Sequence, residues 1–258
     1  MTYKEFCLEV SKKAGLIMKE YFKKDETSFE SKSDMTIVTE ADKAINKLVI
    51  QEVKKNYPGH GVIGEEESYL SDSEYQWVVD PIDGTSMFSI GVPTNVFALA
   101  LCQNKTPVIS CVFNPYTDET WLSEDEKAYC NSKPITCMPD DFSKNKRLII
   151  GICTEKSSKY NLHKVPEYLC DNLNASIVNL RSTIYMDMLV ASGKIAGNIA
   201  FSNHGHDCIG SMIVEMAGGK TTCTKGTEIR LTSKNDGYVS SNGVIHDQLL
   251  EILKMFEN

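Results

Sequence analysis

The sequence has little positive charge and no long apolar run. It holds 27 Lys and Arg residues against 35 Asp and Glu residues, which gives a net charge of -8 at pH 7. A general nucleic-acid binder needs clustered Lys and Arg to neutralise phosphates, so this composition argues against that class. No apolar segment approaches the roughly 20 residues of a membrane-spanning helix, and the N-terminus has no signal-peptide core. We therefore expect a cytoplasmic protein that binds neither nucleic acid nor a membrane.

The sequence also lacks the cysteine pattern of a disulfide framework or a zinc site. Its nine cysteines are odd in number, none forms a C-x-x-C pair, and several lie within apolar runs. Reduced and mostly buried thiols are the expected state. No internal repeat or low-complexity segment is present, and 258 residues with 41% hydrophobic content suffice to bury a rigid core.

Hydrophobic spacing predicts two helices followed by a set of strands. Residues 3–22 have the spacing of an amphipathic helix, and Thr39 with Asp42 has the pattern of a capping pair for a second helix, which ends at Pro58-Gly59. Short apolar runs between turn residues predict strands of one sheet. These runs are residues 62–63, 77–79, 96–102, 108–113 and 120–122.

Beyond residue 145 the pattern changes to alternating strands and helices. We expect strands at 147–153, 176–180, 195–201 and 238–241, and helices at 160–173, 184–192, 207–217 and 245–257. This order predicts an α/β protein with two sheets and interleaved helices. A soft boundary near residue 140 divides it into an α+β half, residues 1–140, and an α/β half, residues 141–258, which together form one compact unit.

Acidic residues stand at the exits of the predicted strands. Glu65 follows the run 62–63, Asp80 and Asp83 follow the run 77–79, and Asp207 begins a predicted helix. Layered α/β proteins bind ligands at strand exits and helix starts. Two carboxylates at ~4 Å repel by about 4 kcal/mol at a protein-like effective dielectric, so a cluster of them requires cations or protons. Carboxylate and carbonyl oxygens favour Mg²⁺ over zinc.

Each acidic segment taken alone has a second interpretation. Asp80 and Asp83 are also compatible with a turn in which the carboxylates bond nearby amides, and Glu65 to Glu67 with a solvated charge run. The register of a calcium-binding helix-loop-helix loop is absent from the segment around Asp80. The combination of the acidic segments therefore carries more weight than any one of them.

The ordered series of motifs resembles the inositol monophosphatase family. The series consists of residues 32–42, Gly64-Glu65-Glu66, WVVDPIDGT at 77–85, residues 128–131, His206-Asp207 and Glu215-Met216-Ala217-Gly218-Gly219. It extends over nearly the whole chain. The resemblance implies an α-β-α-β-α sandwich of the sugar-phosphatase type. It also implies a Mg²⁺-dependent, lithium-sensitive phosphomonoesterase that forms homodimers.

The resemblance implies a role for each matching residue. The metal ligands would be Glu65, Asp80, the carbonyl group of Ile82, Asp83 and Asp207, which together hold two or three Mg²⁺ ions. Asp42 and Thr85, assisted by Glu65, would orient and deprotonate the attacking water. The substrate contacts would be Asp83, Gly84, Thr85, Ser182 and Asp207. Attack of water on phosphorus would be direct, without a covalent phosphoenzyme.

Several positions depart from the family's pattern. His206 stands where Trp is usual, and we expect it to fill a structural slot; Ile209 and Gly210 stand where small alanines are common. Ala200 replaces a Glu that accepts hydrogen bonds from ring hydroxyls in inositol-cleaving members. Because such a bond contributes about 1 kcal/mol or more, its absence removes discrimination for a polyol.

The substrate therefore has several candidates. Inositol phosphate comes first, with histidinol phosphate, a sugar phosphate or a 3'-phosphonucleotide as alternatives within the same fold. An alternative of a different class is a catalytically silent protein that binds metal or phosphate. Its signature would be a lost ligand, and every matching acidic position is occupied by an acid.

Overall fold

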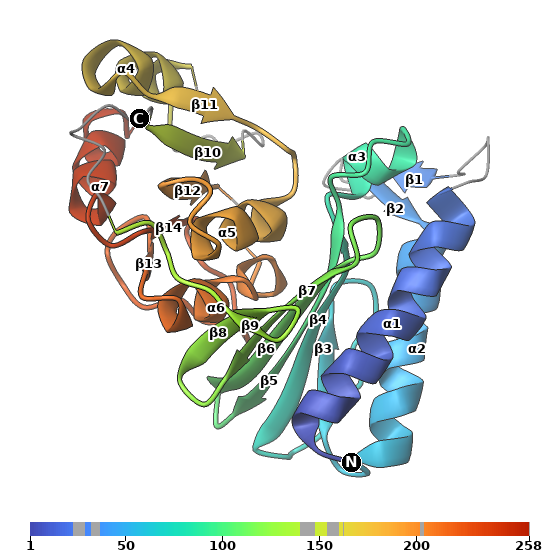
Figure 1. Cartoon of the computed structure of the whole chain (residues 1–258). Coiled ribbons are helices and arrows are strands. Elements are labelled where there is room, and N and C mark those ends of the chain that lie inside the picture. The colour runs from blue at the N-terminus through green and yellow to red at the C-terminus, as the bar shows by residue number, and fades with distance from the viewer. Residues whose placement is uncertain are drawn as a thin grey trace.

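The structure, a computed structural model, describes residues 1–22, 29–31, 37–139, 148–153, 160–161, 163–201 and 204–257. Within these ranges, two mixed β-sheets alternate with pairs of helices in five layers (Figure 1). The predicted α-β-α-β-α sandwich is confirmed. Residues 140–147 lie outside the described ranges, so the proposed boundary near residue 140 stays a prediction.

A seven-stranded sheet carries most of the acidic residues. Its strands lie side by side in chain order: β3 (Gly61–Gly64), β4 (Tyr75–Asp83), β5 (Val96–Gln103), β6 (Thr106–Asn114), β7 (Glu119–Glu124), β8 (Lys127–Cys130) and β9 (Lys133–Pro134). Strand β3 is parallel to β4, and each later pair of neighbours is antiparallel. The five predicted strands are confirmed. Strands β8 and β9 were not predicted: β8 contains only the short apolar run Ala128 to Cys130, and the edge strand β9 contains none.

Two long helices cover the outer face of this sheet (Figure 1). These are α1 (Tyr3–Phe22) and α2 (Glu40–Asn56), both as predicted. The apolar side of α1 packs on the sheet, with Phe6 1% exposed and Trp77 and Leu99 fully buried in one cluster. Helix α2 follows a short hairpin of β1 (Phe29–Ser31) and β2 (Ile37–Thr39).

A five-stranded sheet forms the other half, in the order β11, β10, β12, β14, β13. The strands are β10 (Ile149–Cys153), β11 (Ser176–Val178), β12 (Gly197–Ala200), β13 (Lys220–Cys223) and β14 (Tyr238–Ser241). Helices α5 (Thr183–Ala191) and α6 (Ser211–Met216) contribute to the buried cluster shared with the first sheet. Helices α4 (Lys164–Leu173) and α7 (His246–Met255) cover the outer face (Figure 1).

Some predicted elements of the second half differ from the structure. The helix predicted at 207–217 is a 3-10 turn, η1 (His206–Cys208), followed by α6, because the backbone bonds Cys208 N–Gly205 O and Ile209 N–His206 O span three residues. Helix α4 begins four residues later than predicted. Strand β13 was not predicted, since its sequence KTTC is largely polar.

The structure also bears on the predictions for the cysteines and for membrane-spanning helices. All nine cysteines are free and seven are buried, which confirms the predicted reduced thiols. Among the residues that the structure describes, no helix combines the length and the apolar character needed to span a bilayer.

Candidate active site

The acidic residues of the strand exits gather at one end of the seven-stranded sheet. Strands β3 and β4 run in parallel, with Gly64 paired to Val79, so the residues that follow β3 lie beside the end of β4. Glu65 and Glu66 therefore reach the same region as Asp80. Helix η1, which carries Asp207, contacts β4 from the other half of the molecule.

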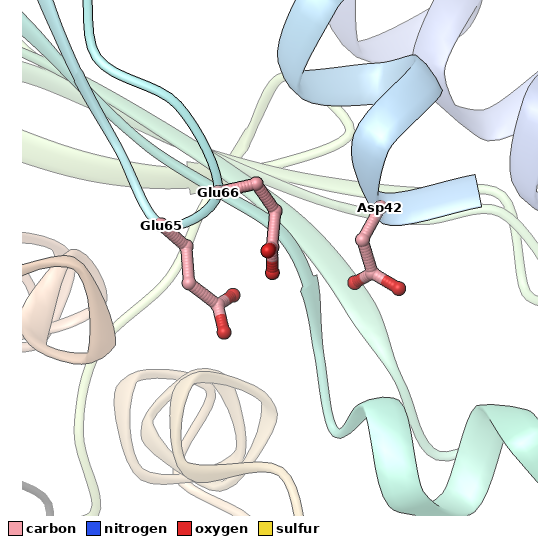
Figure 2. A group of neighbouring side chains, drawn as sticks. All are labelled: Asp42, Glu65 and Glu66. Atoms are coloured by element: carbon pink, nitrogen blue, oxygen red, sulfur yellow. The ribbon is translucent and has the colours of Figure 1, made fainter. Parts of the chain in front are cut away.

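Asp42, Glu65 and Glu66 form the tightest group of acids. One carboxylate oxygen of each lies within 4.8 Å of those of the other two. Figure 2 shows the three side chains, Asp42 from the first turn of α2 and the two glutamates from the loop after β3. Glu66 had been assigned no role from the sequence, where two adjacent glutamates resemble a solvated charge run. Its backbone amide donates to Asn46 Oδ1 at 3.4 Å, which helps to fix the loop against α2.

Asp42 serves both the helix start and the acidic group. Its Oδ2 accepts a bond from the Thr39 amide at 2.8 Å, and its own amide donates to Thr39 Oγ1 at 3.4 Å, so the predicted capping box is present. The pKa of Asp42 is raised to about 7, because burial and the negative charges of Glu65 and Glu66 outweigh the bonds from Thr39, which lower it. Thr85 Oγ1 lies 3.5 Å from Asp42 Oδ1 and donates to the Ile82 carbonyl at 2.9 Å.

Asp80 is a buried acid of the site with an oxygen that makes no hydrogen bond to the described residues. Its side chain is 2% exposed, and its Oδ1 has no hydrogen-bond partner among the described residues. Burial raises the pKa of Asp80 well above its ordinary value, and the charges of Glu65, Asp83 and Asp207 raise it further. An ionised carboxylate in such surroundings requires a cation. A hard divalent cation fits this oxygen, since the charged groups that act on it, Glu65, Asp83 and Asp207 among them, are carboxylates.

Asp83 faces the N-terminus of α5, a helix from the other half of the molecule. Its carboxylate accepts bonds from Ser182 Oγ at 2.5 Å and from the amides of Thr183 at 3.1 Å, Ile184 at 2.8 Å and Tyr185 at 3.3 Å. It thereby satisfies amides that have no partner within the helix. Burial raises the pKa of Asp83 to about 6, while these bonds lower it. Ser182, predicted to touch the substrate, contacts Asp83.

Gly84 allows the two halves to approach closely. It has a φ of 92° and precedes α3 (Thr85–Ser89). A Cβ atom at this position would lie 3.0 Å from Ser182 Cβ and 3.2 Å from the Arg181 carbonyl oxygen. The left-handed backbone and the close contact both require glycine.

Asp207 lies in η1 beside two histidines. His206 Nε2 is 3.7 Å from Asp207 Oδ1, and the His206 ring stacks on His204 with 5.2 Å between ring centroids. The hydroxyl group of Tyr238 lies 3.1 Å from the carbonyl oxygen of Asp207. The structure thus brings the acids from three distant chain segments close enough for their charges to act on Asp80.

Comparison with known proteins identifies the family. The model of the inositol monophosphatase family matches residues 2–256. The chain belongs to the inositol monophosphatase family. Inositol monophosphatase 3 of Solanum lycopersicum is 28% identical over 96% of this chain and 95% of its own. Histidinol-phosphatase of Chlorobaculum parvum is 30% identical over 95% of this chain and 94% of its own. The structure of a Thermotoga maritima IMPase superposes with a TM-score of 0.87 at 24% identity, covering 99% of this chain and 98% of its own.

Membership confirms the resemblance and sets the reaction class. The chain is a phosphomonoesterase of a family that depends on Mg²⁺, and the buried acidic residues at the ends of β3 and β4 are consistent with this requirement. The relatives of similar identity differ in the substrate that their names give. The comparisons therefore leave the substrate to be argued from the site.

Proposed function

We propose that this protein hydrolyses a small phosphate monoester with Mg²⁺ ions held by the acids at the ends of β3 and β4. The observation that carries the proposal is Asp80 Oδ1, a buried oxygen without a hydrogen-bond partner among the described residues. The charges of Asp42, Glu65, Asp83 and Asp207 all act on this carboxylate. At neutral pH such an arrangement is compensated either by protons or by a cation, and the Mg²⁺ dependence of the family supports the cation.

Five groups would hold two or three Mg²⁺ ions. They are Glu65, Asp80, the Ile82 carbonyl, Asp83 and Asp207, with Glu66 adding charge next to them. When bound, Mg²⁺ neutralises phosphate oxygens and lowers the pKa of a water nucleophile. Asp83 accepts five bonds from residues 182–185 and a carboxylate has about four acceptor sites, so Asp83 would have to give up at least one of these bonds to bind Mg²⁺.

Thr85 and Asp42 would orient the attacking water and take its proton. Thr85 donates its hydroxyl proton to the Ile82 carbonyl, so its oxygen is left as an acceptor for a proton of that water. Asp42 Oδ1 lies 3.5 Å away, and a carboxyl group whose pKa is about 7 suits a proton acceptor near neutral pH. Glu65 stands in the same group and would assist.

The substrate would lie between the start of α3 and η1. The amides of Gly84 and Thr85 would bind phosphate oxygens, and Asp83 and Asp207 would flank the leaving group. Ser182 would act on the substrate through Asp83, to which it donates its hydroxyl proton. Ala200 is fully buried and carries no polar group, so no acceptor for a ring hydroxyl exists at that position. Inositol phosphate stays the first candidate, followed by histidinol phosphate, a sugar phosphate and a 3'-phosphonucleotide.

A panel of these esters tests the proposal. Release of inorganic phosphate should require Mg²⁺, stop on chelation and be inhibited by Li⁺, and the best substrate is the ester with the highest kcat/KM. The variant Asp80→Asn should release none. If the wild-type chain binds Mg²⁺ but hydrolyses no ester of the panel, the catalytically silent alternative replaces this proposal. A homodimer, the expected assembly, is tested separately by sedimentation.

A further inference from the structure

A buried polar network joins α5 to the second sheet. Asp187 Oδ1 accepts a bond from Asn198 Nδ2 at 2.8 Å, and Asp187 Oδ2 lies 2.9 Å from the Tyr238 hydroxyl. All three side chains are fully buried. A buried carboxyl group lowers stability unless it is well bonded, and none of the three residues has a role in the proposed reaction.

The network reaches Asp207 through Tyr238. The same hydroxyl that bonds Asp187 lies 3.1 Å from the Asp207 carbonyl oxygen. A phenol carries one proton, so it donates to one of these oxygens at a time. Burial raises the pKa of Asp187 to about 7, so a protonated Asp187 is available at neutral pH. In that form Asp187 donates to the phenol oxygen and Tyr238 donates to Asp207, so both bonds of the Tyr238 hydroxyl group can form at the same time.

Asp187 also lies close to the turn that follows Asp207. A Cβ atom at Gly210 would lie 2.8 Å from both Cβ and Oδ2 of Asp187. Glycine at this position, where the family commonly has alanine, therefore leaves the room that the carboxyl group occupies. Asp187 is thus linked to Asp207 through Tyr238, and it lies close to the turn at Gly210, three residues after Asp207.

The place of the Tyr238 ring depends on Ala200. The two residues are directly opposite each other in the antiparallel pair of β12 and β14, so their side chains share one face of the sheet. The small methyl group of Ala200 leaves space for the phenol ring beside it. Ala200, which departs from the family's pattern, thus lies beside the Tyr238 ring on the same face of the sheet.

We propose that Asp187 and Tyr238 are positioning residues that orient Asp207 for Mg²⁺ binding. The inference rests on the proposed function, in which Asp207 is a metal ligand. Groups that orient a metal ligand without touching the metal usually change metal affinity by about 10- to 100-fold when they are removed. Removing the Asp187 carboxyl group or the Tyr238 hydroxyl group is therefore expected to weaken Mg²⁺ binding by protein that is still folded.

Calorimetric titration of Mg²⁺ into metal-free protein tests the proposal. Tyr238→Phe keeps the ring and removes only the hydroxyl, so it should weaken Mg²⁺ binding by about tenfold or more. Asp187→Ala should do the same, while Asp187→Asn should stay close to wild type, because its amide can donate to the phenol oxygen and still accept from Asn198. The matched control is Ser192→Ala, which removes the acceptor of a 3.0 Å bond from Trp121 Nε1 at the far end of α5.

The unfolding midpoint of each metal-free variant separates positioning from a merely structural role. The proposal is supported if Tyr238→Phe loses Mg²⁺ affinity while its midpoint matches that of Ser192→Ala. It is overturned if Tyr238→Phe and Asp187→Ala bind Mg²⁺ as tightly as the wild type. It is also overturned if Ser192→Ala loses as much affinity as they do. If the wild-type protein binds no Mg²⁺, the proposed function itself is overturned. This outcome is seen before any variant is made, so it is distinguishable from failure of the present proposal.

Discussion

Replacing Glu66 with Gln should stabilise the metal-free protein and weaken its response to Mg²⁺. Glu66 has carboxylate oxygens within 4.8 Å of those of Asp42 and Glu65. At that separation two unit charges repel by about 3.5 kcal/mol at an effective dielectric of 20, and by about 0.9 kcal/mol in water. Glu65 and Glu66 are half-buried, so screening is partial. We therefore expect a net gain of about 1–3 kcal/mol from relief of the two repulsions.

The gain in stability should shrink when Mg²⁺ is added. If Glu66→Gln lowers Mg²⁺ affinity tenfold, saturating Mg²⁺ stabilises the variant by about 1.4 kcal/mol less than it stabilises the wild type. Urea unfolding with a chelator and with Mg²⁺ measures both effects, at a pH of about 8 because the pKa of Asp42 is about 7. Glu67→Gln is the matched control, since Glu67 is exposed in the same loop and outside the acidic group. The reasoning is refuted if the two variants unfold alike in both conditions.

Three further predictions concern Thr85, Asp83 and Asp187. Thr85→Val should lower kcat by about 100-fold or more and leave Mg²⁺ affinity near that of the wild type, because the hydroxyl group orients the attacking water. Steady-state phosphate release over a Mg²⁺ titration measures both quantities, and a loss of Mg²⁺ affinity as large as the loss of kcat would contradict the prediction. Ser182→Ala removes a bond to the buried Asp83 carboxylate, so it should lower the free energy of unfolding by about 1.5–3 kcal/mol. Urea unfolding measures this loss, and an unchanged midpoint would show that the bond is unimportant. The raised pKa of Asp187, about 7 against an ordinary 3.8, gives stability that is fully present below about pH 4 and falls by about 4 kcal/mol as the pH rises to 7. The difference in unfolding free energy between metal-free wild type and Asp187→Asn should follow this curve, and a difference independent of pH would falsify the assignment.

The fold was largely predictable because its elements have strong local patterns. Strand β4 contains the fully buried apolar residues Trp77 to Val79, and α2 begins at a capping pair that is legible from residues 39 and 42. Strands β8, β9 and β13 were missed because they are short. Strands β9 and β13 are largely polar and lie at sheet edges, and β8 pairs with β7 and β9, so neighbouring strands and not local hydrophobicity decide the conformation.

The candidate site was only partly predictable from sequence. Glu65 directly follows β3, Asp80 and Asp83 lie within the last four residues of β4, and Asp207 lies in η1, so the local pattern indicates where these acids stand along the chain. The bonds of Asp83 to α5 join residues about 100 positions apart, so no local spacing indicates them. Asp187 is likewise one acid within an apolar helix, and its partners come from β12 and β14. Such partners become visible only when the sheets are assembled.

Anomalous diffraction from crystals soaked in Mn²⁺, which accepts the same oxygen ligands as Mg²⁺, tests the central claim most directly. The account predicts an anomalous peak roughly 2 Å from Asp80 Oδ1, with Glu65 and Asp207 oxygens among its neighbours. A crystal at neutral pH in which Asp80 Oδ1 is bonded to a protein donor, with no peak beside it, would contradict the account.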